Sequence, residues 1–202
     1  MTHDVPFSLI CNKTNKKYGY MFAKVMDPNT LVIEKYGNRS NIDMGVYIDV
    51  FPLDGLGDTK EEAVKSLRKI NFLHGILIAS NWKKFFRSKT RPIYYEPIRF
   101  AFFCLSRVVS YRKLINKAES KYDFDSFDKS KYVGCVCGSY GVREILEYET
   151  VSEYEDVVFE GTTFKGPKHY DKFLTGFYGD YMQLPPVEKR VTHHTFDALY
   201  KE

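Results

Sequence analysis

The chain has 202 residues, of which 44% are hydrophobic and 28% are charged, as is typical of one soluble globular domain with a substantial core. Its formal net charge of +4 is compatible with anionic substrates such as nucleotides or phosphate-bearing polymers. That charge is too small to indicate a nucleic-acid-binding protein, so we expect no nucleic-acid partner.

Cysteines and apolar runs bear on the location of the chain. The four cysteines form no C-x-x-C motif, which favours free thiols in a reducing cytosol. Residues 1–15 lack the apolar core of a signal peptide, and the apolar runs at 70–82 and 98–109 are too short to span a membrane. We therefore expect a cytoplasmic protein. Residues 83–92 mix basic and aromatic side chains, which suits contact with an anionic polymer, peripheral contact with the inner face of the membrane, or a solvated connection between helices.

Residues 18–35 have the pattern of a β-hairpin. An aromatic and apolar strand over 18–26 leads to the turn Asp-Pro-Asn-Thr at 27–30, and a second strand returns over 31–34. Lys24 lies among apolar neighbours on the first strand. It is either a snorkelling residue at the sheet edge or a phosphate contact.

The stretch Gly-Val-Tyr-Ile-Asp-Val-Phe-Pro-Leu-Asp-Gly at 45–55 is the centre of the predicted fold. Its alternation predicts a short buried strand that ends before Pro52, followed by a turn. Asp49 places a carboxylate inside this apolar run, so a cation or a hydrogen-bond donor must lie beside it. Asp49 is either a metal ligand of a phosphoryl or nucleotidyl transferase, or a structural residue that caps a turn or pairs with a basic core neighbour.

Three helices are predicted after the central strand. Thr59 and Glu62 form a capping box, which starts a helix that should reach residues 82–86. A second helix is expected from Pro97 through Val109, and a third from 110 to about 122. The core face of the first helix is predicted to contain Ala63, Leu67, Ile70, Leu73, His74 and Leu77.

The last third of the chain is predicted to contain a strand, a hairpin and a helix. The strand covers 132–137, and the hairpin covers 156–164 with its turn at Glu160-Gly161. Pro167 opens the helix and Gly179 closes it. The acidic residues at 123–128 are interpreted as a loop, because no apolar strand aims them at one ion.

Several motifs in this order resemble the LicD family of phosphocholine transferases and related phosphotransferases, which modify bacterial surface polysaccharides and are related to the animal fukutin proteins. The resemblance covers residues 7–200. It rests on the stretch 45–55, Phe159-Glu-Gly161, Pro167 with Tyr170, Asp171 and Leu174, Tyr178-Gly-Asp-Tyr-Met182, Pro185-Pro186, Arg190 and His193-His194.

The resemblance implies an α/β (α+β) chain with a nucleotidyltransferase-like mixed sheet and a helical insertion after the central strand. It also implies a phosphotransferase that depends on Mg²⁺ or Mn²⁺. The donor would be a nucleotide-activated compound such as CDP-choline. The acceptor would be a hydroxyl group of lipopolysaccharide, teichoic acid or capsule. Such chemistry relies on positioning and charge neutralisation.

The resemblance also assigns site residues near the central strand. Asp49 becomes a metal ligand or the base that takes the acceptor proton. Asp54 is a weaker metal candidate, since an Asp before Gly is also favoured in a plain turn. Lys24 matches a family position, which favours phosphate binding.

The C-terminal signature adds Arg190, His193 and His194. The guanidinium group would bind donor phosphates, and an imidazole would donate to phosphate or transfer a proton. The alternative is a C-terminal helix whose histidines bond to the core.

One departure from the family pattern limits the prediction. The Gly-rich turn and the Asp-rich run that carry the first two metal carboxylates are not found before Gly45. We therefore expect a single partial LicD-type domain, with a hairpin and acidic strand at 1–58, helices at 59–122, and a hairpin and helices at 123–202. Its sheet would be incomplete at the N-terminus and would leave an edge exposed.

Two functional hypotheses follow from that departure. The first is a LicD-type phosphotransferase that is incomplete or inactive as this chain, being a truncated product or a gene fragment of an otherwise active enzyme. The second is a non-catalytic module that has lost the metal-binding half and binds nucleotide, polymer or a separately encoded N-terminal partner. A soluble α/β domain with a purely structural acidic strand is a third and weaker interpretation.

Overall fold

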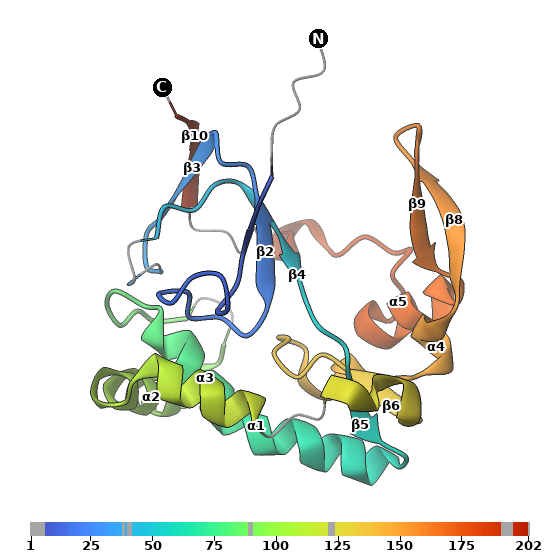
Figure 1. Ribbon diagram of the computed structural model, residues 1–202, viewed down its shortest axis with the longest axis horizontal. Coiled ribbons are helices and arrows are strands. Elements are labelled where there is room, and N and C mark those ends of the chain that lie inside the picture. Colours follow the sequence, from blue (N-terminus) through green and yellow to red (C-terminus); the bar gives the residue numbers. More distant parts are fainter. Residues whose placement is uncertain are drawn as a thin grey trace. The chain divides into compact units, whose positions relative to one another are not determined.

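The computed structural model describes residues 7–37, 39, 42–88, 91–120, 124–190 and 196–201. The chain divides into two compact units, one of residues 1–51, 72–121 and 192–202, the other of residues 52–71 and 122–191. Over the described residues it contains five α-helices and four small sheets (Figure 1). This confirms the mixed α/β class. The nucleotidyltransferase-like mixed sheet stays a prediction: every described strand pair is antiparallel, and the described sheets have only two or three strands.

The first unit contains two of the sheets. One has the order β1 (Ser8–Ile10), β2 (Ala23–Met26), β4 (Tyr47–Val50), and the other pairs β3 (Thr30–Glu34) with β10 (Phe196–Tyr200).

The predicted hairpin at 18–35 is therefore wrong in its pairing, although the turn and both strands form. The segment 44–50 takes the place of the partner strand. Its Met44 carbonyl accepts from the amide of Val32, and its β4 pairs with β2.

The central strand β4 does not bury its apolar residues. Val46, Ile48 and Val50 are exposed by 46%, 67% and 45%, so the predicted buried strand is wrong. Tyr47, on the other face, packs against the core of this unit, which consists of Ile10, Tyr18, Val32 and Met44. Because side chains alternate along a strand, burying Tyr47 turns its apolar neighbours outward. In the sheet order β1-β2-β4, β4 is an edge strand.

The helical segment contains the three predicted helices, but the first ends at Ser80 and not in the predicted region 82–86. The helices are α1 (Lys60–Ser80), α2 (Glu96–Val108) and α3 (Tyr111–Glu119). The capping box forms, since the amide of Glu62 donates to Thr59 Oγ1 and the amide of Thr59 donates to Glu62 Oε2, both at 3.2 Å. The predicted face of α1 is buried, and burial lowers the pKa of His74 to about 4, so this imidazole is neutral.

The aromatic residues after α1 are packed rather than solvated. Phe85 lies 5.9 Å from Phe103 of α2 between ring centroids, and Phe86 stacks on Tyr36 at 4.6 Å. The guanidinium group of Arg99 lies over the Trp82 ring. A short 3₁₀ helix, η1 (Ile93–Tyr95), precedes α2. No helix of the described residues has both the length and the apolar character needed to span a bilayer.

Over its described residues the second unit contains two sheets, two whole helices and the first part of α1, residues 60–71. One sheet has the order β5 (Asp54–Gly57), β6 (Tyr132–Gly134), β7 (Ile145–Glu147), and the other pairs β8 (Tyr154–Phe159) with β9 (Thr162–Pro167). Its helices are α4 (Glu149–Ser152) and α5 (Tyr170–Tyr178), with short 3₁₀ turns η2 (Phe124–Lys129), η3 (Gly141–Glu144) and η4 (Val187–Lys189). The core centres on Val133, Leu146 and Val151.

Turn residues in this unit follow the prediction. Glu160 and Gly161 both have positive φ, at 48° and 77°, which is the conformation that a tight two-residue hairpin requires. Gly179 closes α5 at φ 72°. Pro167 ends β9 rather than opening the helix, which begins three residues later.

Candidate functional site

The structure brings two predicted site residues of the first unit together. Lys24 on β2 and Asp49 on β4 are register partners, and Lys24 Nζ donates to Asp49 Oδ1 at 2.6 Å. The side chain of Lys24 is 6% exposed and that of Asp49 is 35% exposed. The snorkelling interpretation of Lys24 is therefore wrong, because its ammonium group is buried. The cation expected beside Asp49 is Lys24.

Aromatic rings enclose the Lys24 ammonium group. The nitrogen lies 3.3 Å from the ring centroid of Tyr47, and 5.3 Å and 5.5 Å from those of Phe22 and Tyr20. Burial lowers the pKa of Lys24, whereas its hydrogen bond to Asp49 favours the charged form. The rings and the carboxylate therefore compensate in part for lost hydration.

A buried polar cluster continues from this pair. Burial raises the pKa of Glu34, and the charge of Lys24 opposes that shift. Burial also raises the pKa of Tyr47 to about 12. The hydroxyl oxygen of Tyr18 is buried and has no hydrogen-bond partner among the described residues. Asp49 is the carboxylate of the cluster that is directly ion-paired, through Oδ1, and none of the described residues donates a hydrogen bond to its Oδ2.

The residues around Asp49 do not fit a divalent cation. Mg²⁺ and Mn²⁺ are held by several oxygen ligands, and here the Asp49 carboxylate bonds an ammonium group instead. Over the part of the chain that the structure describes, no group of three or more His, Cys, Asp or Glu could hold a metal ion. We therefore derive no catalytic step through a metal.

Asp54, the second predicted metal residue, belongs to the other unit. The sequence predicts a turn there, but Asp54 begins β5 and is 3% exposed. Gly55 permits this strand, because a Cβ at this position would lie 2.3 Å from the backbone oxygen of Ser126. Burial raises the pKa of Asp54 to about 6, and its Oδ2 has no hydrogen-bond partner among the described residues.

The C-terminal signature is described only in part. Arg190 also belongs to the second unit, is exposed, and donates from Nε to the carbonyl oxygen of Pro185 at 2.7 Å. This bond connects the two ends of the loop 185–190, which contains Pro185-Pro186. His193 and His194 lie outside the described residues. The phosphate role of Arg190 and the proton-transfer roles of the histidines stay predictions.

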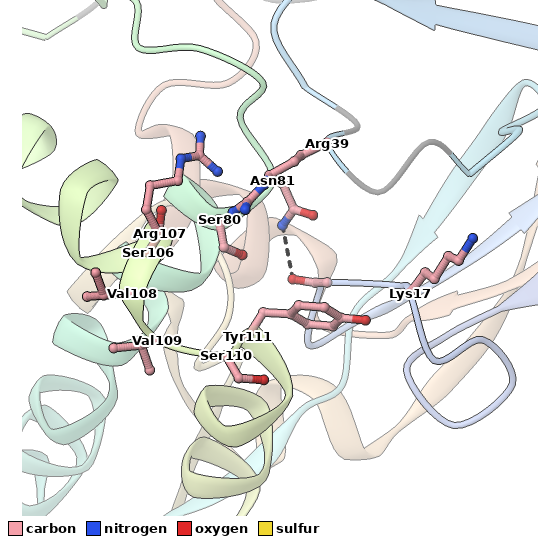
Figure 2. A pocket seen from close by; sticks show the side chains of 11 residues that line it. Lys17, Arg39, Ser80, Asn81, Ser106, Arg107, Val108, Val109, Ser110 and Tyr111 are labelled. Carbon is pink, nitrogen blue, oxygen red and sulfur yellow. Dashed lines mark hydrogen bonds between the residues drawn. The ribbon is translucent and has the colours of Figure 1, made fainter.

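Sequence reasoning missed a positively charged cavity in the first unit. Lys17, Arg39 and Arg107 line it, together with Asn81 and Tyr111, as Figure 2 shows. The three cations are separated by 22 and 68 positions (39 minus 17, 107 minus 39). No local motif joins them, so only the tertiary fold reveals the group.

Comparison with known proteins gives one relative. The chain is 26% identical over 186 residues to the lipopolysaccharide cholinephosphotransferase LicD of Haemophilus influenzae. The aligned residues cover 90% of this chain and 66% of that protein. The chain thus spans just under two thirds of the length of this curated relative. No protein-family model and no solved structure matches. The similarity to this LicD protein extends over nine tenths of the sequence.

Proposed function

We propose that this chain takes part in transferring phosphocholine from CDP-choline to a hydroxyl group of lipopolysaccharide. The similarity to a lipopolysaccharide cholinephosphotransferase along 90% of the chain carries this proposal. A teichoic acid or a capsule sugar would offer an acceptor hydroxyl of the same kind. The nucleotidyltransferase-like fold belongs to the same proposal, since the small sheets of the described residues do not decide it.

In the proposed reaction, the acceptor oxygen forms a bond to the phosphorus of phosphocholine. The bond from that phosphorus to the bridging oxygen breaks, and CMP leaves. The acceptor proton passes to Asp49, whose Oδ2 accepts no hydrogen bond from the described residues and whose side chain is 35% exposed. Lys24 acts as a positioning residue, because its bond to Oδ1 fixes the orientation of the carboxylate.

A non-catalytic binding module is the second candidate. One observation favours it: the described residues offer no ligand set for a divalent cation. Such a module would bind CDP-choline or the polymer without turning it over.

The test is a transfer assay with the purified chain, CDP-choline and lipopolysaccharide that lacks phosphocholine. Mass spectrometry would follow the added phosphocholine and the released CMP, with EDTA, Mg²⁺ or Mn²⁺ in parallel samples. We expect transfer by the unmodified chain. Asp49→Asn should lower the rate by about 100-fold or more, as for loss of a positioned base. Asp156→Asn, in an exposed Lys–Asp pair, is the matched control.

Each outcome separates the candidates. Absence of transfer under all three ion conditions contradicts the transferase proposal for this chain, and binding of CDP-choline without transfer supports the module. Transfer at an unchanged rate by a folded Asp49→Asn variant removes Asp49 from the reaction but leaves the transferase proposal intact.

A further inference from the structure

A cavity in the first unit carries positive charge without a neutralising carboxylate. Its volume is about 340 Å³, which is within the range of sites for small ligands. Lys17, Arg39 and Arg107 come to it from different segments of the chain (Figure 2). None of the described residues that line it is Asp or Glu. Three like charges around one cavity repel each other, and a bound anion would relieve that repulsion.

Arg107 is the most constrained of the three cations. Its Nη2 donates to the carbonyl oxygen of Trp82, and its guanidinium carbon lies 4.2 Å from the centroid of the Phe103 ring. Its Nη1 is buried and has no hydrogen-bond partner among the described residues. Burial, followed by the charge of Arg39, lowers the pKa of Arg107. Two neighbouring guanidinium groups without a carboxylate among the lining residues are costly, and an anion between them would offset that charge.

The N-terminus of α3 lies at the same cavity. Ser110 and Tyr111 line it, and Ser110 is the N-cap residue of this nine-residue helix. The Ser110 side chain makes no capping hydrogen bond. The first backbone amides of a helix lack internal partners, and the helix dipole makes this end favourable for negative charge. The helix end thus adds to the preference that the three cations create.

We propose that this cavity binds a phosphate-bearing anion, namely the phosphate or diphosphate group of a nucleotide or of a phosphorylated sugar. Arg39 and Lys17 contribute charge from exposed positions, and Arg107 contributes charge from a half-buried one. The Ser110 hydroxyl and the α3 amides complete the set of donors. This binding stands on the geometry of the first unit and does not require transferase activity.

The cavity adjoins the polar cluster of the Lys24–Asp49 pair. Asn81 and Gly19 line both this cavity and a smaller one that Lys24 and Glu34 also line. Asn81 Nδ2 donates to the Gly19 carbonyl oxygen at 3.0 Å, the bond drawn in Figure 2. The Asn81 side chain and the Gly19 backbone therefore lie between this cavity and the smaller one that Lys24 lines. If the proposed function holds, a phosphate in the cavity would be close to the pair assigned to proton transfer.

Calorimetric titration of the full chain tests the site. The probes are inorganic pyrophosphate, CDP-choline and glucosamine phosphate, each in low and high NaCl. We expect pyrophosphate to bind, with an affinity that falls as salt rises. Arg39→Gln should weaken it about tenfold, and Lys17→Gln/Arg39→Gln should weaken it further. Arg68→Gln removes the same charge from an exposed position on α1, does not line the cavity, and should leave binding unchanged.

Arg107→Lys is the variant that tests hydrogen-bond geometry. It keeps the charge but loses the fork of the guanidinium group, so it should also weaken binding, with a melting curve to verify folding. The site is refuted if no probe binds, or if the Arg39 and double variants bind as tightly as the Arg68 variant. Tighter binding of CDP-choline assigns the cavity to the donor, and tighter binding of glucosamine phosphate assigns it to the acceptor. Because pyrophosphate binding is measured without turnover, failure of this site and failure of the transferase are distinguishable.

Discussion

The ion pair of Lys24 and Asp49 should contribute far more to stability than an exposed pair of the same kind. The chain supplies a matched comparison, since Asp156 and Lys165 are also register partners on neighbouring antiparallel strands and also form an ion pair. Their side chains are 62% and 69% exposed, against 6% for Lys24. Replacing each aspartate by asparagine therefore removes a Lys–Asp ion pair of the same geometry, once where the lysine is buried and once where both side chains are exposed.

The structure sets the expected magnitudes. Loss of one partner from a buried ion pair costs about 3–5 kcal/mol, because a charge stays buried without compensation. Asp49 keeps 35% of its side chain exposed, so water reaches the pair, and we expect Asp49→Asn to cost about 2–3 kcal/mol. The rings around Lys24 remain and retain their attraction. Asp156→Asn should cost no more than about 0.5 kcal/mol.

Urea denaturation at pH 7 measures the difference. Circular dichroism follows the whole chain, and the single tryptophan, Trp82, reports on the first unit. In the Asp49→Asn variant the Lys24 ammonium group stays buried without its partner, and adding Lys24→Met removes that group. The double-mutant cycle of these two substitutions should therefore give a coupling energy of about 2 kcal/mol. If Asp49→Asn costs no more than Asp156→Asn, the buried pair does not stabilise the fold and the reasoning is refuted.

Three further predictions concern single positions. Asp54→Asn should raise the free energy of unfolding at pH 7 by about 1–3 kcal/mol. Burial raises the pKa of Asp54 in the folded state from 3.8 to about 6. The stabilising effect of the protonated carboxyl group is therefore complete below pH 4 and is lost as pH rises through 6. The free energy of unfolding, measured by denaturation between pH 4 and 8, should depend on pH in the parent chain in a way that the variant lacks. Gly55→Ala should cost about 1–3 kcal/mol in the same assay, because its Cβ would press on the Ser126 backbone, whereas Gly176→Ala, with nothing within 4 Å, should be neutral or stabilising. Thr59→Ala should lower the melting temperature through loss of about 1 kcal/mol of capping energy.

Local signals in the sequence predicted local structure well. The capping box at Thr59 and Glu62 fixes the start of α1, because its bonds join residues only three positions apart. The turn at Glu160-Gly161 likewise depends on the backbone preferences of two residues. The class of the chain and the helical segment after the central strand follow from such short-range rules.

Long-range pairing was not predictable in the same way. The alternation at 45–51 fixes which residues share a face of β4, but it does not say which face is buried. The tyrosine ring and the ion pair with Lys24 turn that face toward the core, so Ile48 is exposed by 67%. The pairing of the segment 44–50 with both β2 and β3 also depends on contacts that no local pattern contains.

The geometry of Lys24 bears on which cation can bind a donor phosphate. The family resemblance predicts a phosphate contact at Lys24 and an acid at Asp49, whereas in the structure each is the partner of the other at 2.6 Å. A phosphate bound by the Lys24 ammonium group would have to displace Asp49 and enter a ring enclosure in which Lys24 is 5% exposed. That exchange replaces one anion by another and adds the cost of burying the second. The cavity lined by Lys17, Arg39 and Arg107 requires no such exchange, because its cations face no carboxylate among the described residues. If both places act in one reaction, the cavity is therefore better suited to hold phosphate, and the pair to orient the acceptor hydroxyl.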